Sequence, residues 1–343
     1  MEYRGKFDVF DAAAIRTYPV SERRNKVSLP DLVLPGRETV PAGLPAAVEA
    51  AVNRVVDAVL EHRRAGRPVI VFAGGHLIKN GLGPLLADLV RRGAVTLVAG
   101  SAATAIHDFE LALFGETSED VPDALGKGQF GMAYEFAYLN TAVALGNEQR
   151  LGFGEALGRM MCDETFRAEV LKRAGRPGAP GGFAHPELSV LAACYACDVP
   201  FTVHAGIGVD VIDQHPSFDG EAKGGCSGRD FLIYARAMTR FGRGGVVLNI
   251  GSAVQGPEVL LKAVSMAANA GAPPRELLTA DFDLRPYDPA QMIDETSGGY
   301  YCRDQKSVVT RVPRAFGGTG IYVQGNQKET FPLLYRGIVE GGR

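Results

Sequence analysis

The segment from His204 to Gly225, HAGIGVDVIDQHPSFDGEAKGG, is dense in imidazole and carboxylate side chains. They belong to His204, Asp210, Asp213, His215, Asp219 and Glu221. In one interpretation, Asp210 and Asp213 hold a cationic or hydroxylated substrate while His204 exchanges a proton with it. In a second, these groups bind zinc, manganese or iron, although no HExxH-type spacing supports a metal. In a third, the aspartates cap turns and the following helix. We expect substrate contact, with no resident metal.

Small or polar residues also stand where several buried apolar runs end. These are Gly74-Gly75-His76, Ala99-Gly100-Ser101, His204-Ala205-Gly206 with Gly208, and Asn249-Ile250-Gly251-Ser252. Glycines let a ligand approach the backbone, and helix N-termini offer N–H donors to a phosphate. Because the carboxyl ends of parallel strands meet at one edge of a sheet, we expect a ligand crevice there. A GxGxxG fingerprint is missing after the first run, so the ordinary dinucleotide-binding motif is absent.

The elements that must position these residues alternate between helix and strand. We expect helices at 44–64, 77–92, 102–114, 186–196, 229–241 and 257–270, and strands at 69–75, 95–101, 200–208, 245–252, 277–283 and 318–325. Continuous apolar runs such as VIVFAGG suit strands that are buried on both faces. The order predicts an α/β protein with a Rossmann-like, doubly wound, mostly parallel sheet and helices on both faces. We expect a single domain over 1–343, with an N-terminal arm at 1–42 and a helical insertion at about 115–182.

Composition excludes several classes of protein. The 343 residues carry 36 Lys and Arg against 39 Asp and Glu, a net charge of −3, so we expect no nucleic-acid partner. Apolar residues make up 46%, which excludes a disordered chain. No run of about 18 apolar residues or signal-like N-terminus occurs, so we expect a cytoplasmic protein without a membrane partner. The five cysteines are scattered, and Cys194 and Cys197 are expected to be small buried residues of a helix rather than a redox pair.

The arm contains the apolar stretch SLPDLVLP. If it lies free, Leu29, Leu32, Val33 and Leu34 present more apolar surface than a monomer usually leaves in water. We therefore expect a homo-oligomer.

Several longer stretches, taken in chain order, carry a resemblance to a known family. They are VIVFAGGHLIKNGLGPLLADLVRRGAVTLVAGSAATAIHDFELAL, PELSVLAACYACDVPFTVHAGIGVDVIDQHP, GVVLNIGSAVQGPEV, SGGYYCRDQKSVVTRV and FPLL. The first resembles the opening βαβα unit of the deoxyhypusine synthase family, and the second its segment leading to an aspartate-bearing active-site loop. The third is similar to its NAD-contacting strand and turn. The last two fall where that family has its catalytic-lysine segment and C-terminal helix.

The resemblance implies a Rossmann-like homotetramer whose NAD and active sites form at subunit contacts. In that family NAD oxidises spermidine, and an enzyme lysine takes up the aminobutyl group as an imine. The NAD-contacting residues implied here are Gly74, Gly75, His76, Gly100, Ser101, Ala102, Gly251, Ser252, Gly325 and Asn326. The implied substrate loop carries Gly208, Asp210 and Asp213, and we add His215 to it.

The chain departs from the family where the covalent step takes place. Val309 stands at the position of the imine-forming lysine and has no nucleophile. Arg303 replaces an acid six positions earlier, and would suit a carboxylate or phosphate better than a polycation. The family's histidine falls near Gly256 or Pro257, and Asn326 stands where the family has an aspartate. Lys306, three residues before Val309, could substitute only if the local path of the chain differs.

Four functions follow from these observations. The first is a deoxyhypusine synthase-like enzyme that binds NAD and acts on a small molecule, as an oxidoreductase or alkyl-group transferase, without the lysine-imine step. The second is a true aminobutyl or polyamine transferase that uses Lys306. The third is a non-catalytic ligand-binding or scaffold protein. The fourth is a metal-dependent hydrolase built on the 204–225 segment. We expect the first, with His204, Asp210, Asp213 and Lys306 as catalytic candidates and Arg303 as a substrate-binding one.

Overall fold

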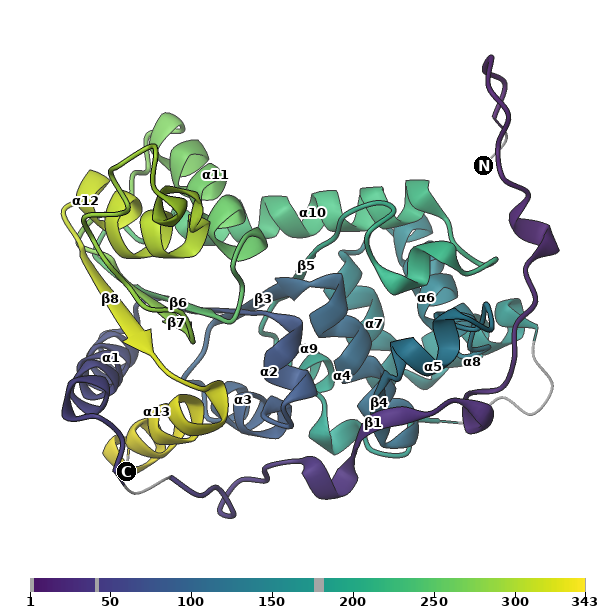
Figure 1. Ribbon diagram of the computed structural model, residues 1–343, viewed down its shortest axis with the longest axis horizontal. Coiled ribbons are helices and arrows are strands. Elements are labelled where there is room, and N and C mark those ends of the chain that lie inside the picture. The colour runs from purple at the N-terminus through teal and green to yellow at the C-terminus, as the bar shows by residue number, and fades with distance from the viewer. Residues whose placement is uncertain (1–2, 41–42, 176–181, 343) are drawn as a thin grey trace.

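A six-stranded parallel sheet forms the centre of the computed structural model, which describes residues 3–40, 43–175 and 182–342 (Figure 1). The strands are β2 (Val69–Ala73), β3 (Leu97–Ser101), β5 (Phe201–His204), β6 (Val246–Ile250), β7 (Leu278–Asp283) and β8 (Thr319–Gln324). They lie in the order β5-β3-β2-β6-β7-β8, so the chain order reverses between β2 and β6. This is the strand order of doubly wound nucleotide-binding sheets, and it confirms the predicted fold class.

Helices cover both faces of this sheet. One face packs against α1 (Ala46–Arg64), α3 (Gly83–Arg91), α4 (Ala102–Phe114), α9 (Val190–Ala196) and α13 (Gln327–Gly341). The other face packs against α10 (Gly220–Met238), α11 (Gln255–Asn269), the π-helix η7 (Gln305–Arg311) and α12 (Val312–Ala315). In Figure 1, α10 and α11 lie above the sheet, and α3 and α13 lie below it. Alternate residues of β2 enter the two cores, Val71 on one side and Phe72 on the other, as strand geometry requires.

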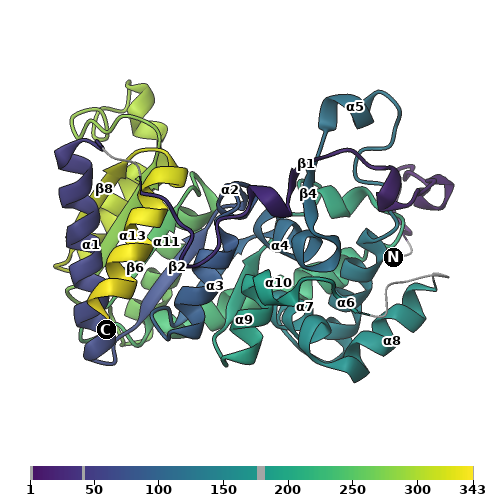
Figure 2. The ribbon, with the colours of Figure 1, turned by 90° about the horizontal axis from the view of Figure 1, so that it is seen from below.

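A helical group lies beyond β5, at the end of the sheet farthest from α1 (Figure 2). It contains α5 (Val121–Leu125), α6 (Phe136–Glu148), α7 (Phe153–Cys162) and α8 (Glu164–Ala174). The short strand β4 (Glu116–Glu119) pairs antiparallel with β1 (Asn25–Ser28) of the N-terminal arm. This pairing ties the arm to the helical group, which the sequence did not predict.

Side chains of α10 join the helical group to the edge strand β5. The buried carboxylate of Asp230 accepts hydrogen bonds from the backbone N–H groups of Phe153, Gly154 and Val203, at 3.1, 3.1 and 2.7 Å. Ser227 Oγ donates to the carbonyl of Val203 at 2.8 Å and accepts from the N–H of Ala205 at 3.0 Å. These bonds occupy backbone groups on the outer edge of β5, which pairs only with β3 in the sheet.

Two of the expected helices differ from the structure by more than their end residues. The predicted helix at 77–92 is divided into α2 (Gly75–Lys79) and α3, because Gly81 between them has a φ of +80°. A Cβ at that position would collide with the carbonyl oxygen of Asp31, so the glycine also lets the arm pack closely. The predicted helix at 229–241 begins at Gly220 instead. Asp219 Oδ1 caps its first turn by accepting from the N–H groups of Glu221 and Ala222 at 2.9 and 3.0 Å.

The apolar surface of the arm is not where the sequence placed it. Leu32 and Val33 pack against the core, so most of SLPDLVLP is used within the chain. Leu29 remains exposed as expected, but the most exposed apolar side chains of the arm are Phe7, Val9 and Phe10, and Phe10 is 79% exposed. Among the helices in the described ranges, none combines the length and the apolar character needed to cross a membrane.

Candidate functional site

The strand order reverses where β2 and β6 lie side by side, and we call the carboxyl ends of these two strands the switch point. The N–H of Gly74 donates to the carbonyl of Ile250 at 2.8 Å, and the N–H of Gly251 donates to that of Phe282 at 3.1 Å. A Cβ at position 74 would collide with the carbonyl oxygen of Gly251. Gly251 itself has a φ of +64°, and a Cβ there would collide with the amide of Gln327. Gly74 is therefore required by close backbone packing, and Gly251 by its positive φ.

The residues expected to contact NAD all lie at the carboxyl ends of β2, β3, β6 and β8. Because these strands are parallel, the structure brings them to one edge of the sheet, the carboxyl edge. Ser101 caps α4 by accepting from the N–H of Thr104 at 3.4 Å, and Asn326 caps α13 by accepting from that of Lys328 at 3.0 Å. Ser252 Oγ accepts from the N–H of Gly256 at 2.9 Å.

The other cofactor candidates occupy the turns between strand and helix. Gly75 and His76 form the first turn of α2, and partial burial, then Lys79 and His107, lower the pKa of His76. Gly100 packs against Thr104, Ala102 is buried at the start of α4, and Gly325 packs against Thr330. The small size of these residues lets the strand-to-helix turns pack closely.

Three buried oxygen atoms near this edge have no hydrogen-bond partner among the described residues. They are Gln327 Oε1, Asn249 Oδ1 and Asp281 Oδ2. Asn249 Nδ2 donates to Asp281 Oδ1 at 2.7 Å and to the carbonyl of Ser252 at 2.9 Å. Burial, followed by the charge of Asp304, raises the pKa of Asp281 well above its ordinary value. Unsatisfied buried oxygens are costly, so they mark this region as a place where a further donor would be accommodated.

Sequence reasoning included Asn249 only as part of a strand end and did not single out Asp281 or Gln327, although a signal was present. Asn249 interrupts the apolar run VVLNI, and Asp281 interrupts LTADFD. The register pairs Asn249 with Asp281 and Asp281 with Tyr322, so one polar row crosses β6, β7 and β8. A polar residue inside a strand that is buried on both faces is a pattern worth testing as a site.

The polar row continues into the π-helix that carries Lys306. Gln305 Nε2 donates to the hydroxyl of Tyr322 at 2.9 Å, and the hydroxyl of Tyr322 donates to the carbonyl of Arg285. Arg285 also forms ion pairs with Asp283 and Asp304. Burial raises the pKa of Asp304 to about 6, although the nearby Arg285 opposes the shift. A carboxyl group with that pKa can hold or release a proton near neutral pH.

Lys306 is 4% exposed and lines a cavity of about 700 Å³ together with Val309. Its ammonium nitrogen lies 3.1 Å from the centre of the Tyr300 ring. Within the described ranges this ammonium nitrogen has no hydrogen-bond or ion-pair partner. Burial, followed by the charges of Arg311 and Arg303, lowers the pKa of the amine. The π-helix therefore brings Lys306 to the same cavity as Val309, the position that the resemblance aligns with the family's lysine.

Arg303 lies outside that cavity. One of its guanidinium nitrogens is 3.4 Å from a carboxylate oxygen of Glu258, in the first turn of α11, and the side chain is half exposed. The expected substrate-binding arginine is thus paired with an acid of the chain itself.

The two candidate aspartates of the 204–225 segment share a buried lysine that the sequence did not single out. Lys223, 2% exposed, forms ion pairs with Asp210, at 2.8 Å, and with Asp213. Its ammonium nitrogen also donates to the carbonyl of Gly206 at 2.7 Å. Asp213 accepts from the N–H of Gly208 at 2.7 Å, and burial raises the pKa of Asp210 although Lys223 opposes this. The carboxylates hold the loop together around an internal cation.

The two histidines of the segment lie apart from this cluster. His204 is buried, stacks on Phe72 with ring centres 5.6 Å apart, and has Nε2 3.1 Å from Thr202 Oγ1. Burial lowers its pKa to about 4, so the ring is neutral at pH 7. His215 Nδ1 lies 2.7 Å from Ser217 Oγ, beside Phe136. In the described part of the chain, no hydrogen bond or ring contact joins His204 to either aspartate, and no cluster there has three side chains suited to a metal ion.

Comparison with known proteins gives similarity in fold only. No protein-family model matches the chain, and no curated protein matches it in sequence. The arginine dihydrolase ArgZ from cyanobacteria is similar over 88% of this chain, with a TM-score of 0.47 and 17% identity. AgrE, in a ternary complex with ornithine and NAD⁺, is similar over 88%, with a TM-score of 0.45 and 16% identity. The chain spans only 33% and 34% of these two proteins.

A third structure covers both chains more evenly. A candidate deoxyhypusine synthase from Entamoeba histolytica is similar over 86% of this chain and 90% of its own, with a TM-score of 0.46 and 9% identity. The structures similar to this chain thus include one described as belonging to the family that the sequence resembles.

Proposed function

We propose that the protein is a deoxyhypusine synthase-like enzyme that binds NAD at the carboxyl edge of its main sheet and acts on a small molecule. The observation that carries this proposal is the meeting of Gly74 and Gly251 at the switch point. In doubly wound sheets, ligands bind beyond the carboxyl ends of the strands where the strand order reverses. The sequence resemblance assigns NAD contacts to the same strand ends.

The residues present fit such a ligand. Ser101, Ser252 and Asn326 offer hydroxyl and amide groups, and the unsatisfied oxygen of Gln327 lies beside Gly251. When bound, NAD would accept or donate a hydride. The chain itself supplies a carboxyl group with a pKa of about 6, at Asp304, for handling a proton. His204, neutral and enclosed by aromatic rings, is poorly placed for that task.

Equilibrium dialysis with NAD⁺ and with NADH tests this proposal. We expect binding of at least one form, and no binding of either at millimolar concentration would contradict it. The variant Gln327→Met should weaken binding about tenfold, the effect of losing one polar contact. Glu340→Gln, near the other end of α13, is the matched control and should bind as the parent does. Gly251 is a poor choice for substitution because its positive φ would strain any other residue.

A second candidate function is favoured by the surroundings of Lys306. Burial and the nearby Arg311 and Arg303 lower the pKa of the Lys306 amine, which favours its neutral, nucleophilic form. Once spermidine has been oxidised to an imine, with its hydride passed to NAD⁺, the Lys306 amine would add to the imine carbon and form a C–N bond. Breakage of the original C–N bond would release a diaminopropane and leave the aminobutyl group on Lys306 as an imine. This is the lysine-imine step that the first candidate lacks.

Borohydride trapping separates the two candidates. The protein is incubated with spermidine and NAD⁺, reduced with borohydride and analysed by peptide mass spectrometry. The first candidate predicts no adduct. An adduct on Lys306 that is lost in Lys306→Met would establish the second. A protein that binds NAD but turns over no substrate would be the non-catalytic alternative.

We also propose that the chain forms a homo-oligomer, with a tetramer as the expected state. The exposed Phe7, Val9 and Phe10 of the arm form the apolar surface that supports it. Light scattering that gives a monomer mass at micromolar concentration would contradict this.

A further inference from the structure

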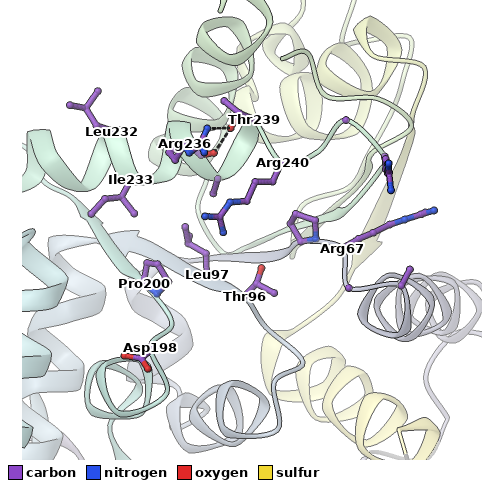
Figure 3. A pocket seen from close by; sticks show the side chains of 16 residues that line it. Arg67, Thr96, Leu97, Asp198, Pro200, Leu232, Ile233, Arg236, Thr239 and Arg240 are labelled. Carbon is purple, nitrogen blue, oxygen red and sulfur yellow. Dashed lines mark hydrogen bonds between the residues drawn. The ribbon is translucent and has the colours of Figure 1, made fainter. Parts of the chain in front are cut away.

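A cavity of about 1,000 Å³ lies at the amino-terminal edge of the main sheet, opposite the switch point. Figure 3 shows it between the starts of the strands and the second half of α10. The cavity is lined on the sheet side by Pro68, Leu97 and Pro200. These residues stand at or just before the starts of β2, β3 and β5. None of the residues assigned above to cofactor or substrate belongs to it.

Four arginines line this cavity and are the main source of its charge. They are Arg67, Arg236, Arg240 and Arg243, and the one acidic residue among the lining side chains is Asp198. The chain as a whole has a net charge of −3, so positive charge is concentrated here against the overall balance. In the described parts of the chain, no ion pair involves any of the four, and Arg236 donates only to Thr239 Oγ1, at 3.2 Å. Their guanidinium groups retain donors for an external anion.

The end of α10 does not by itself account for this charge. Basic residues in a last helical turn balance a helix dipole of about half a charge. Arg236, in the last turn of α10, is placed to balance the dipole of that helix. Arg240 and Arg243 lie beyond the last residue of α10, Met238. Arg67 comes from a different part of the chain, just before β2. Figure 3 shows Arg240 reaching into the cavity above Leu97, on the side away from any acid of the lining.

The remaining lining side chains are mainly apolar, and Thr96, Thr239 and Asp198 are the polar ones among them. Leu97, Pro200 and Ile233 form an apolar wall, and Leu232 beside it is 58% exposed. Asp198 lies across the cavity from the arginines (Figure 3). A ligand that matches these features has phosphate groups at one end, a flat apolar body and a hydroxyl or amino group that can donate to a carboxylate.

We propose that this cavity binds a nucleoside polyphosphate, with the phosphates at the arginines and the base against the apolar wall. Its volume is at the upper end of small-molecule sites and suffices for a nucleotide. The site is independent of the NAD site proposed at the carboxyl edge.

Isothermal titration calorimetry with ATP and with inorganic tripolyphosphate tests this inference. We expect both to bind, ATP more tightly. Arg240→Glu should weaken ATP binding about ten- to a hundredfold, because a charge-assisted contact is replaced by repulsion. Arg54→Glu, exposed on α1, makes the same change in net charge and should bind ATP as the parent does. NAD binding should be the same in both variants.

Three results would overturn the inference. The first is no binding of either probe at millimolar concentration. The second is unchanged ATP affinity in Arg240→Glu, which would place the nucleotide elsewhere. The third is equal affinity for ATP and tripolyphosphate, which would exclude recognition of the nucleoside. Arg240→Gln, a milder change, replaces Arg240→Glu if circular dichroism shows that the latter is unfolded.

Discussion

The ammonium nitrogen of Lys223 lies 2.8 Å from the carboxylate of Asp210, inside the loop expected to recognise a substrate. Asp213 completes the cluster, so two carboxylates surround one buried cation. The loop is therefore positioned by an internal ion-pair network, and any ligand that binds there meets carboxylates already engaged by the chain.

We expect Lys223→Met to destabilise the protein by about 3–5 kcal/mol, because it leaves two carboxylates buried without a cation. Asp210→Asn should cost much less, since the remaining pair of Asp213 and Lys223 is neutral. Urea unfolding of the two variants and the parent measures both effects. Equal losses in the two variants would show that the network does not act as described.

Stability should depend on pH through His204. Its pKa is about 4 in the folded protein and about 6.5 when unfolded, so only the unfolded state takes up the proton between these values. The stability it provides is complete above pH 6.5 and is lost as pH falls toward 4. Between pH 7.5 and 5 the loss is about 2 kcal/mol. His204→Gln should lose less stability than the parent over this interval, and parallel losses would contradict the assignment.

Two glycine substitutions should act in opposite directions. Gly74→Ala places a methyl group against the carbonyl of Gly251, so we expect a loss of about 2 kcal/mol or more. Gly228→Ala, within α10, meets no atom within 4 Å and should stabilise the protein by about 0.5–1 kcal/mol. Thermal unfolding of both variants provides the measurement. A stable Gly74→Ala variant would mean that the strands can separate at the switch point.

The pKa of Lys306 should rise when a neighbouring charge is removed. Arg311 repels the protonated amine, so Arg311→Met favours the charged form. The pH at which the amine becomes neutral should move upward, toward the ordinary value for lysine. Reductive ¹³C-methylation followed by an NMR titration reports that pH directly, with Arg314→Met as the control. No difference between Arg311→Met and the parent would show that the charge of Arg311 does not contribute to the shift.

Much of the fold could be predicted because buried parallel strands have continuous apolar runs in their sequences. VIVFA and VVLNI are strands β2 and β6, and the helix expected at 102–114 has these bounds in the structure. The start of α10 was missed because GEAKGGCSG is rich in glycine, which disfavours a helix, and tertiary contacts override that preference. The π-helix has no sequence pattern distinct from that of an α-helix.

The site was harder to predict than the fold. The residues at the carboxyl ends of the strands could be assigned to one edge of the sheet, because all strands of a parallel sheet end at the same edge. The direction of His204 could not be known, because both faces of β5 are buried and the histidine could enter either core. Lys223 lies between glycine-rich stretches and has the appearance of an exposed residue in sequence. Its burial depends on Asp210 and Asp213, which precede α10 in the sequence and come close to Lys223 only in the folded chain.

The bonds that Asp230 and Ser227 make with β5 determine how copies of this chain can associate. An edge strand with free N–H and C=O groups is a template on which a strand from another molecule can add. Here the N–H groups of Val203 and Ala205 and the carbonyl of Val203 are already bonded to α10. A strand from another molecule therefore cannot pair with these groups of β5. If copies of this chain associate at the β5 end, they would therefore meet through side-chain surfaces rather than through a continuous sheet.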